Sequence, residues 1–338
     1  MIKFGYFTDT HARFDTPEER TDNFLLSLLT KLEEVGQIFK DNKVDYVLFG
    51  GDLYDSDSVA KSVITSIQTV LRSWQLPIIG VVGSHDYFGY QMKTLKSTAL
   101  GITESAGIID IIGGYAHPQS TQIMQNGEMI VTIVGTPHTY TFADSYKNMY
   151  ADDFDASSSN FMIQIVHGDL NDKPVPWRHI LIADELTCAD LVLSGHYHPG
   201  WDKPIIKRSC IEGRNTTFIN PGSISRMKNT GVVRTPRVCI ISVEGDKFTN
   251  EFIKLTTAIP HPFKEKKDAV EDEEPMPDIA KFFEIINKDR ENIGVVDVKG
   301  QLLLVADKLS YDEEVIENAM LYLDRASGAE TETETEES

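Results

Sequence analysis

Residues 44–55 of the chain read VDYVLFGGDLYD. The apolar run of this stretch predicts a buried β-strand over Val44–Phe49, which Gly50-Gly51 ends in a turn. The turn is followed at once by Asp52 and Asp55. A buried strand that leads through glycine into carboxylates is typical of an α/β sheet with polar side chains on its rim.

Four more short motifs each follow an apolar run, and most carry a glycine. They are Asp9-Thr10-His11, Gly83-Ser84-His85-Asp86, His167-Gly168 and Gly195-His196-Tyr197-His198. Strand ends gather at the rim of a sheet, so we expect these distant positions to form one cluster. Alternate residues of an extended segment project to one side, so the two outer residues of Asp-x-His or of His-x-His can coordinate one ion. All five motifs in this order indicate a metal site far more strongly than any one of them alone.

The types of side chain predict the class of metal. Carboxylates and imidazoles together suit divalent ions such as manganese, iron and zinc. The three cysteines, Cys188, Cys210 and Cys239, lie outside the motifs and form no CxxC pair. Their spacing argues against a cysteine-rich structural zinc site, and it favours buried thiols in a reducing, cytoplasmic setting.

The net charge of −20 is unevenly spread along the 338 residues. Residues 264–338 hold 22 acidic and 9 basic side chains, a net of −13, which leaves −7 for residues 1–263. Phosphate binding needs local positive charge, so metals, a basic patch or a partner subunit would have to overcome this acidity in any nucleic-acid binder.

Strand candidates near the N-terminus alternate with helical patterns at Pro17–Phe39 and Val59–Trp74, which predicts an α/β layered domain. Thr16 is the expected N-cap of the first helix. Later strand candidates lie closer together and predict a second sheet with hairpin connections. The charged run Lys264–Glu274 and the prolines after it indicate a boundary. We therefore expect a domain at 1–250, a small C-terminal α/β extension at 251–326 and a disordered acidic tail at 327–338.

No apolar run reaches about 18 residues, so no membrane span is expected. The N-terminus has no signal-peptide pattern.

The five motifs resemble those of the calcineurin-like metallophosphoesterase superfamily, whose pattern is DxH, GDxxD, GNH(D/E), H and GHxH. The resemblance covers about residues 1–245 and implies a four-layer αββα sandwich of mixed α/β (α+β) class. It also implies two metal ions that share Asp52. The implied ligands are Asp9, His11, Asp52 and His198 for the first ion, and Asp52, Ser84, His167 and His196 for the second.

One departure from the family pattern concerns the second ion. The family usually carries asparagine where this chain has Ser84, and a hydroxyl is a shorter and poorer neutral ligand than an amide oxygen. The second ion would then bind more weakly, or a water would complete its shell.

Two implied catalytic residues follow Ser84. His85 would face the scissile phosphate without binding metal, and would stabilise the charged transition state or protonate the leaving oxygen. Asp86 would either orient the His85 imidazole or bond the backbone of its own turn. Outside the motifs, His138 is interpreted as an ordinary core or surface side chain, with the rim of the cleft as the alternative.

The second and third motifs also bear on the substrate. Protein phosphatases of this fold usually carry Arg-Gly after the last aspartate of the second motif, whereas Ser56-Asp57 follows Asp55 here. The GDxxD and His-Asp forms are more similar to the SbcD-type DNA-repair nuclease branch and its phage counterparts.

That resemblance implies a manganese-dependent DNA exonuclease/endonuclease. It would work with an SbcC-like coiled-coil ATPase, as a homodimer, in the cytoplasm or in the host cytoplasm if phage-encoded. Two alternatives stay open: a phosphatase or phosphodiesterase acting on a small molecule or nucleotide, and a non-catalytic scaffold.

Overall fold

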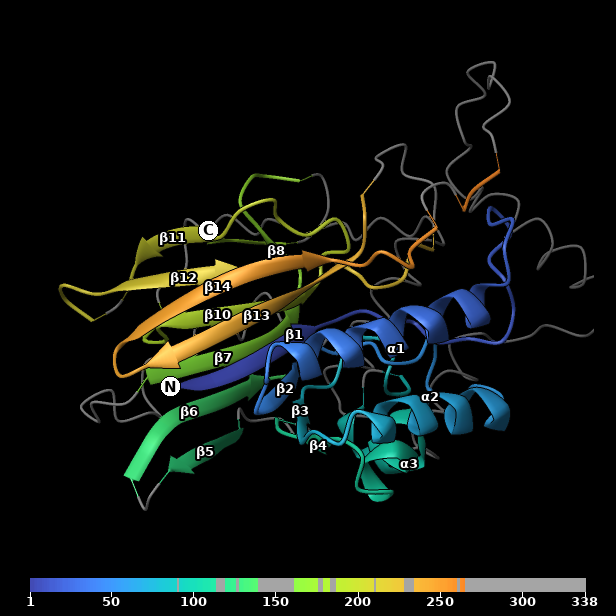
Figure 1. Ribbon diagram of the computed structural model, residues 1–338, viewed down its shortest axis with the longest axis horizontal. Coiled ribbons are helices and arrows are strands. Elements are labelled where there is room, and N and C mark those ends of the chain that lie inside the picture. Colours follow the sequence, from blue (N-terminus) through green and yellow to red (C-terminus); the bar gives the residue numbers. More distant parts are fainter. Residues whose placement is uncertain are drawn as a thin grey trace, which may run out of the picture. The chain divides into compact units, whose positions relative to one another are not determined.

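Two six-stranded sheets organise the described part of the chain (Figure 1). The computed structural model describes residues 1–89, 91–113, 119–125, 128–138, 161–175, 179–182, 187–209, 211–227, 234–259 and 262–264. All of them belong to one unit, Met1–Glu265. Among these residues, none of the helices has the length and apolarity needed to cross a bilayer.

The first sheet is mixed, with the order β14-β13-β1-β2-β3-β4. Its strands are β1 (Ile2–Phe7), β2 (Tyr46–Phe49), β3 (Ile78–Gly80), β4 (Asp110–Ile111), β13 (Arg237–Glu244) and β14 (Lys247–Lys254). β1 to β4 are parallel, whereas β13 pairs antiparallel with both β1 and β14. The last strands of the described unit therefore pack beside its first strand.

The second sheet has the order β11-β12-β10-β7-β6-β5. Its strands are β5 (Gln119–Gln125), β6 (Glu128–Thr136), β7 (Phe161–Gly168), β10 (Leu191–His196), β11 (Ile205–Arg208) and β12 (Asn215–Ile219). The expectation of hairpin connections holds only for the edge pairs β5–β6 and β11–β12. The central strands are parallel instead, and β7 and β10 are buried along nearly their whole length, as parallel strands usually are.

An apolar core joins the two sheets. Phe4 and Tyr6 of β1 pack in one cluster with Ile163 and Ile165 of β7, and all four side chains are fully buried. A smaller apolar cluster, which includes Val192 and residues of the short strands β8 (Leu170–Asn171) and β9 (Ile180–Leu181), lies at the second sheet. The α/β sandwich is as predicted, but the second helical layer has no counterpart among the described residues.

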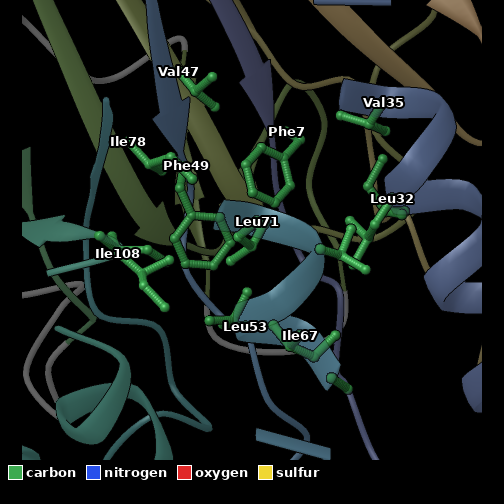
Figure 2. Close-up of a cluster of buried hydrophobic side chains, with 14 of the residues drawn as sticks. Phe7, Leu32, Val35, Val47, Phe49, Leu53, Ile67, Leu71, Ile78 and Ile108 are labelled. Atoms are coloured by element: carbon green, nitrogen blue, oxygen red, sulfur yellow. The ribbon is translucent and has the colours of Figure 1, made fainter. Parts of the chain in front are cut away.

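The helices α1 (Phe24–Asp41), α2 (Lys61–Ser73) and α3 (Ala99–Ser105), with the 3-10 helix η1 (Met92–Ser97), belong to the cluster on the first sheet. Figure 2 shows Phe7 and Phe49 in one cluster with Leu32 of α1 and Leu71 of α2. The rings of Phe7 and Phe49 lie 5.0 Å apart. This packing holds the ends of β1 and β2, where the first two motifs begin.

The first helix begins later than expected. The side chain of Asn23, not that of Thr16, caps α1 by accepting a hydrogen bond from Leu26 N. Residues 17–23 carry no apolar side chain that could pack on a sheet, so nothing extends the helix through them. Thr16 instead accepts a hydrogen bond from Phe24 N.

The boundary expected at residue 250 falls inside β14, and the chain then returns to the N-terminal loop. Thr21 N donates to Pro262 O, and Lys264 N donates to Glu19 O. The guanidinium of Arg20 lies 5.8 Å from the centre of the Phe263 ring. Residues 262–264 therefore anchor the end of this unit; the predicted extension and tail beyond it lie outside the described residues.

Lys31 on α1 is a buried lysine, 2% exposed. Its Nζ donates to Ile224 O at 2.7 Å. Burial, helped by the positive charges of Arg20 and Arg226, lowers the pKa of Lys31 to about 7. The amine therefore loses its proton near neutral pH, far below the pH at which an exposed lysine does.

We expect the free energy of unfolding of the wild type to rise between pH 7 and pH 10 relative to that of Lys31→Met. In this window the unfolded chain holds a proton on Lys31 that the folded chain lacks, so stability increases with pH. The difference should be on the order of several kcal/mol. Urea unfolding of both proteins at the two pH values measures it, and parallel pH profiles would contradict the lowered pKa.

Candidate metal centre

The five motifs meet where neighbouring strands end. Asp9 and His11 follow β1, Asp52 follows β2 and Ser84 follows β3, and these three strands are adjacent and parallel in the first sheet. His167 near the end of β7 and His196 at the end of β10 come from adjacent parallel strands of the second sheet. The rims of both sheets thus supply one cluster.

The cluster contains three groups of side chains that could hold a metal ion, and within each the ligand atoms all lie within 4.8 Å of one another. The groups are Asp9, His11 and His198; His11, Asp52 and His85; and Asp52, His167 and His196. His11 and Asp52 each belong to two groups. The shared residues connect the groups, so the donor atoms form one continuous cluster.

Short distances between donor atoms make this cluster suited to cations. His11 Nε2 and His198 Nε2 are 2.9 Å apart, and His167 Nε2 and His196 Nδ1 are 3.3 Å apart. His167 Nδ1 lies 2.7 Å from Gly50 O, to which only an N–H can donate, so Nε2 is left facing Asp52. Metal-binding histidines usually carry such an outer hydrogen bond. The donors therefore fit divalent ions.

The pKa shifts of Asp52 and His167 also favour a bound cation. Burial acts to raise the pKa of Asp52, but the charge of His167, followed by His11 and His85, holds it well below its usual range. Burial acts to lower the pKa of His167, but Asp52 at 3.2 Å raises it to about 9. Without metal, a proton on His167 therefore balances Asp52, and a cation at this place would displace it.

Four motif residues have backbone conformations that are unusual for side chains other than glycine. Asp9, His11, Asp52 and His196 have φ angles of 54°, 44°, 56° and 76°. The two other described non-glycine residues with positive φ, Lys43 and Gln75, simply follow the ends of α1 and α2. Strained residues of this kind gather at functional sites, where the surrounding structure holds them in place.

Ser84 and His85 lie on either side of the Asp52 carboxylate. Ser84 Oγ donates to Asp52 Oδ2 at 3.2 Å, and His85 N donates to Asp52 Oδ1 at 2.8 Å. The His85 ring is exposed, and its Nδ1 lies 2.7 Å from Asp55 O. Because that carbonyl can only accept, Nδ1 carries a proton, and Nε2 is the ring nitrogen left to meet a ligand or substrate.

Asp86 does not orient the His85 ring, which corrects the first of its two expected roles. Its buried carboxylate accepts hydrogen bonds from Gly83 N at 2.8 Å, Asp52 N at 2.9 Å and Leu53 N at 3.2 Å. The contact to Gly83 is the expected bond within its own turn. The other two contacts fix the loop that carries Asp52, because a carboxylate can accept several amide protons at once.

Asp55 lies on the outer side of His11. Its Oδ1 is 3.6 Å from His11 Nδ1, and its Oδ2 accepts a hydrogen bond from Arg13 Nη1 at 2.8 Å. Asp55 therefore shapes the loop around both His11 and His85.

Two further residues lie at the site: Ser223, and His138, for which the rim of the cleft was the alternative to an ordinary core or surface position. Ser223 Oγ donates to Asp9 O at 2.9 Å. His138 stacks on His196 with ring centres 5.5 Å apart and an angle of 29° between the planes. Burial, followed by the charges of His167 and His196, lowers the pKa of His138 to about 3 and keeps it neutral. Both residues follow central strands of the second sheet, and this position after a strand is the sequence signal that they share with the motif residues.

Comparisons with known proteins agree with this geometry. A family model described as calcineurin-like phosphoesterase matches residues 2–200. The double-strand break repair protein mre-11 of Caenorhabditis elegans is 21% identical over 313 residues, which cover 77% of this chain but only 42% of that protein. The chain therefore spans less than half the length of this relative.

Solved structures with a similar fold include the calcineurin-like phosphoesterase YfkN from Bacillus subtilis. It is 14% identical with a TM-score of 0.46, and the match covers 78% of this chain and 93% of that one. A dimetal phosphatase from Danio rerio is 10% identical with a TM-score of 0.46, and the match covers 74% and 95% of the two chains.

Proposed function

Because this chain belongs to the calcineurin-like phosphoesterase family, we propose that it is a two-metal phosphodiester hydrolase that cleaves DNA in repair or recombination. The observation that carries the proposal is the convergence of three potential metal-binding groups that share His11 and Asp52. The choice of DNA rests on the His-Asp form of the third motif and on the similarity to a double-strand break repair protein.

We assign the ligands as the resemblance to the family implies, and every one of them except Ser84 belongs to one of the potential metal-binding groups. A first divalent ion would take Asp9, His11, Asp52 and His198, and a second would take Asp52, Ser84, His167 and His196, with manganese as the expected metal. When bound, such a pair supplies Lewis-acid chemistry that polarises a phosphate and activates water. His85 would contact the phosphate through its Nε2, while Asp86 positions the loop of Asp52.

The proposal includes partners, because the net charge of −20 opposes unaided DNA binding. We propose a coiled-coil ATPase subunit and a second copy of this chain, in a reducing cytoplasmic setting. The described cysteines, Cys188 and Cys239, are buried thiols that form no disulfide, which suits that setting.

Cleavage of linear duplex DNA in the presence of manganese tests this function. The full chain is assayed with and without a candidate ATPase, with p-nitrophenyl phosphate as the competing monoester. Degradation of DNA that disappears in Asp9→Asn supports the nuclease. Intact DNA with rapid turnover of the monoester favours the phosphatase, and no turnover of either, without bound metal, favours the scaffold.

Replacing Ser84 with asparagine is expected to strengthen manganese binding at the second position. The Ser84 hydroxyl already lies 3.2 Å from Asp52, and an amide oxygen reaches further and is a better neutral ligand. Calorimetric titration of the metal-free protein should show about tenfold tighter binding of one of the two ions, in the range of changes near metal ligands. Unchanged affinity in Ser84→Asn would argue that position 84 is not a ligand.

A further inference from the structure

A hollow of about 270 Å³ opens beside His85. Its lining includes Asp55, Asp57, Ser84, His85 and Phe88. Because Ser84 and His85 border Asp52, the hollow adjoins the place where the proposed reaction occurs. It is smaller than the 300–1,000 Å³ typical of pockets for drug-sized ligands, so a single ring system fits it better than a base pair.

Phe88 presents an aromatic ring at this hollow from a fixed backbone. The side chain is 55% exposed. Its backbone N–H donates to Thr94 Oγ1 at 3.0 Å, and its carbonyl accepts from Gln91 N at 3.1 Å. The preceding Tyr87 is buried and donates its hydroxyl to His138 O at 2.9 Å. The backbone that carries the ring is therefore fixed, and the ring itself is open to solvent.

The charges around the hollow select against an anion. Asp55 is paired with Arg13, whereas Asp57 adds a second carboxylate that stands partly open to solvent. A second phosphate group would meet these carboxylates at close range, and like charges repel. A neutral heterocycle that carries amino donors suits an aromatic face and acidic neighbours much better.

We propose that this hollow binds one nucleobase of the substrate, stacked on Phe88, next to the phosphate that faces His85. The inference rests on the proposed phosphodiesterase function. It narrows the proposed DNA substrate to a nucleotide whose base is unstacked. Stacking is tolerant of sequence because every base has an aromatic face. A base in this hollow has left the duplex stack, so the enzyme takes an unpaired or frayed nucleotide.

Binding of 2-aminopurine deoxyribonucleoside 5′-monophosphate tests the proposal without requiring catalysis, because the fluorescence of this base falls when it stacks on a ring. The full chain with manganese should quench the probe, and Phe88→Ala should raise its dissociation constant about tenfold, within the range measured for base stacking. Phe88→Tyr should restore binding. Phe14→Ala is the matched control, because Phe14 is 63% exposed and does not line the hollow.

The binding and cleavage results together distinguish failure of the nucleobase site from failure of the proposed DNA cleavage. No quenching by the wild type, equal binding by Phe88→Ala, or an equal loss in Phe14→Ala would overturn the nucleobase site. A protein that cleaves DNA but shows one of these results keeps its function and loses only the site. A protein that quenches through Phe88 but cleaves only monoesters keeps the site, and its proposed action on DNA fails.

Discussion

Replacing His85 with alanine is expected to slow phosphodiester cleavage about 10²–10⁴-fold, the usual contribution of a positioned acid or base, while both metal ions stay bound. His85 is exposed, and its Nδ1 lies 2.7 Å from Asp55 O, which leaves Nε2 to meet the substrate. Cleavage rates of a p-nitrophenyl phosphodiester, together with metal content measured by mass spectrometry, check both parts of this expectation.

The metal content is the decisive part, because His85 also lies in one potential metal-binding group with His11 and Asp52. His196→Ala is the matched control; it should lose metal as well as activity. If His85→Ala loses an ion in the same way, His85 is a ligand and not the group that faces the phosphate.

Asp52→Asn should remove both activity and metal, and we expect it to have the largest effect of any single substitution. Asp52 is 1% exposed and lies between the two halves of the cluster, 3.7 Å from His11 Nε2 and 3.2 Å from His167 Nε2. An amide keeps the shape but not the charge that balances the cations. The cleavage rate should fall further than that of His85→Ala, by more than about 10⁴-fold, because this carboxylate is the proposed ligand of both ions.

Metal content and the cleavage rate are measured for this variant beside Asp45→Asn. Asp45 is also an aspartate at β2, but its carboxylate only accepts a hydrogen bond from Lys3 N. Asp45→Asn should therefore retain both ions. Two ions bound to Asp52→Asn at wild-type affinity would exclude Asp52 as the shared ligand.

The central strands and the family could be predicted because local sequence determines them. β2 lies within the predicted strand Val44–Phe49 and ends at the same residue, and the calcineurin-like family is confirmed by the model that matches residues 2–200. β14 was missed because it is an edge strand with many polar residues, stabilised by pairing with β13 over its whole length. Such pairing between segments leaves little trace in the hydrophobic pattern of either strand.

The candidate site was likewise predicted only where local sequence determines it. The motif residues could be predicted because each stands directly after an apolar run. The partners of Asp86 could not, since Asp52 N and Leu53 N lie more than thirty positions away along the chain. His138 and Ser223 also follow strands, but their place at the site could not be settled from the sequence, because it depends on which strands are neighbours and that order emerges only when the sheet forms.

The positive φ angles of Asp9, His11, Asp52 and His196 carry a consequence for directed evolution. Each such conformation costs on the order of 1–3 kcal/mol, and glycine adopts it without that cost. A screen for thermal stability alone should therefore enrich glycine at these four positions. The selected variants would be more stable but would lack the proposed metal ligands. Selection has to include turnover at every round if the thermostable descendants are to remain enzymes.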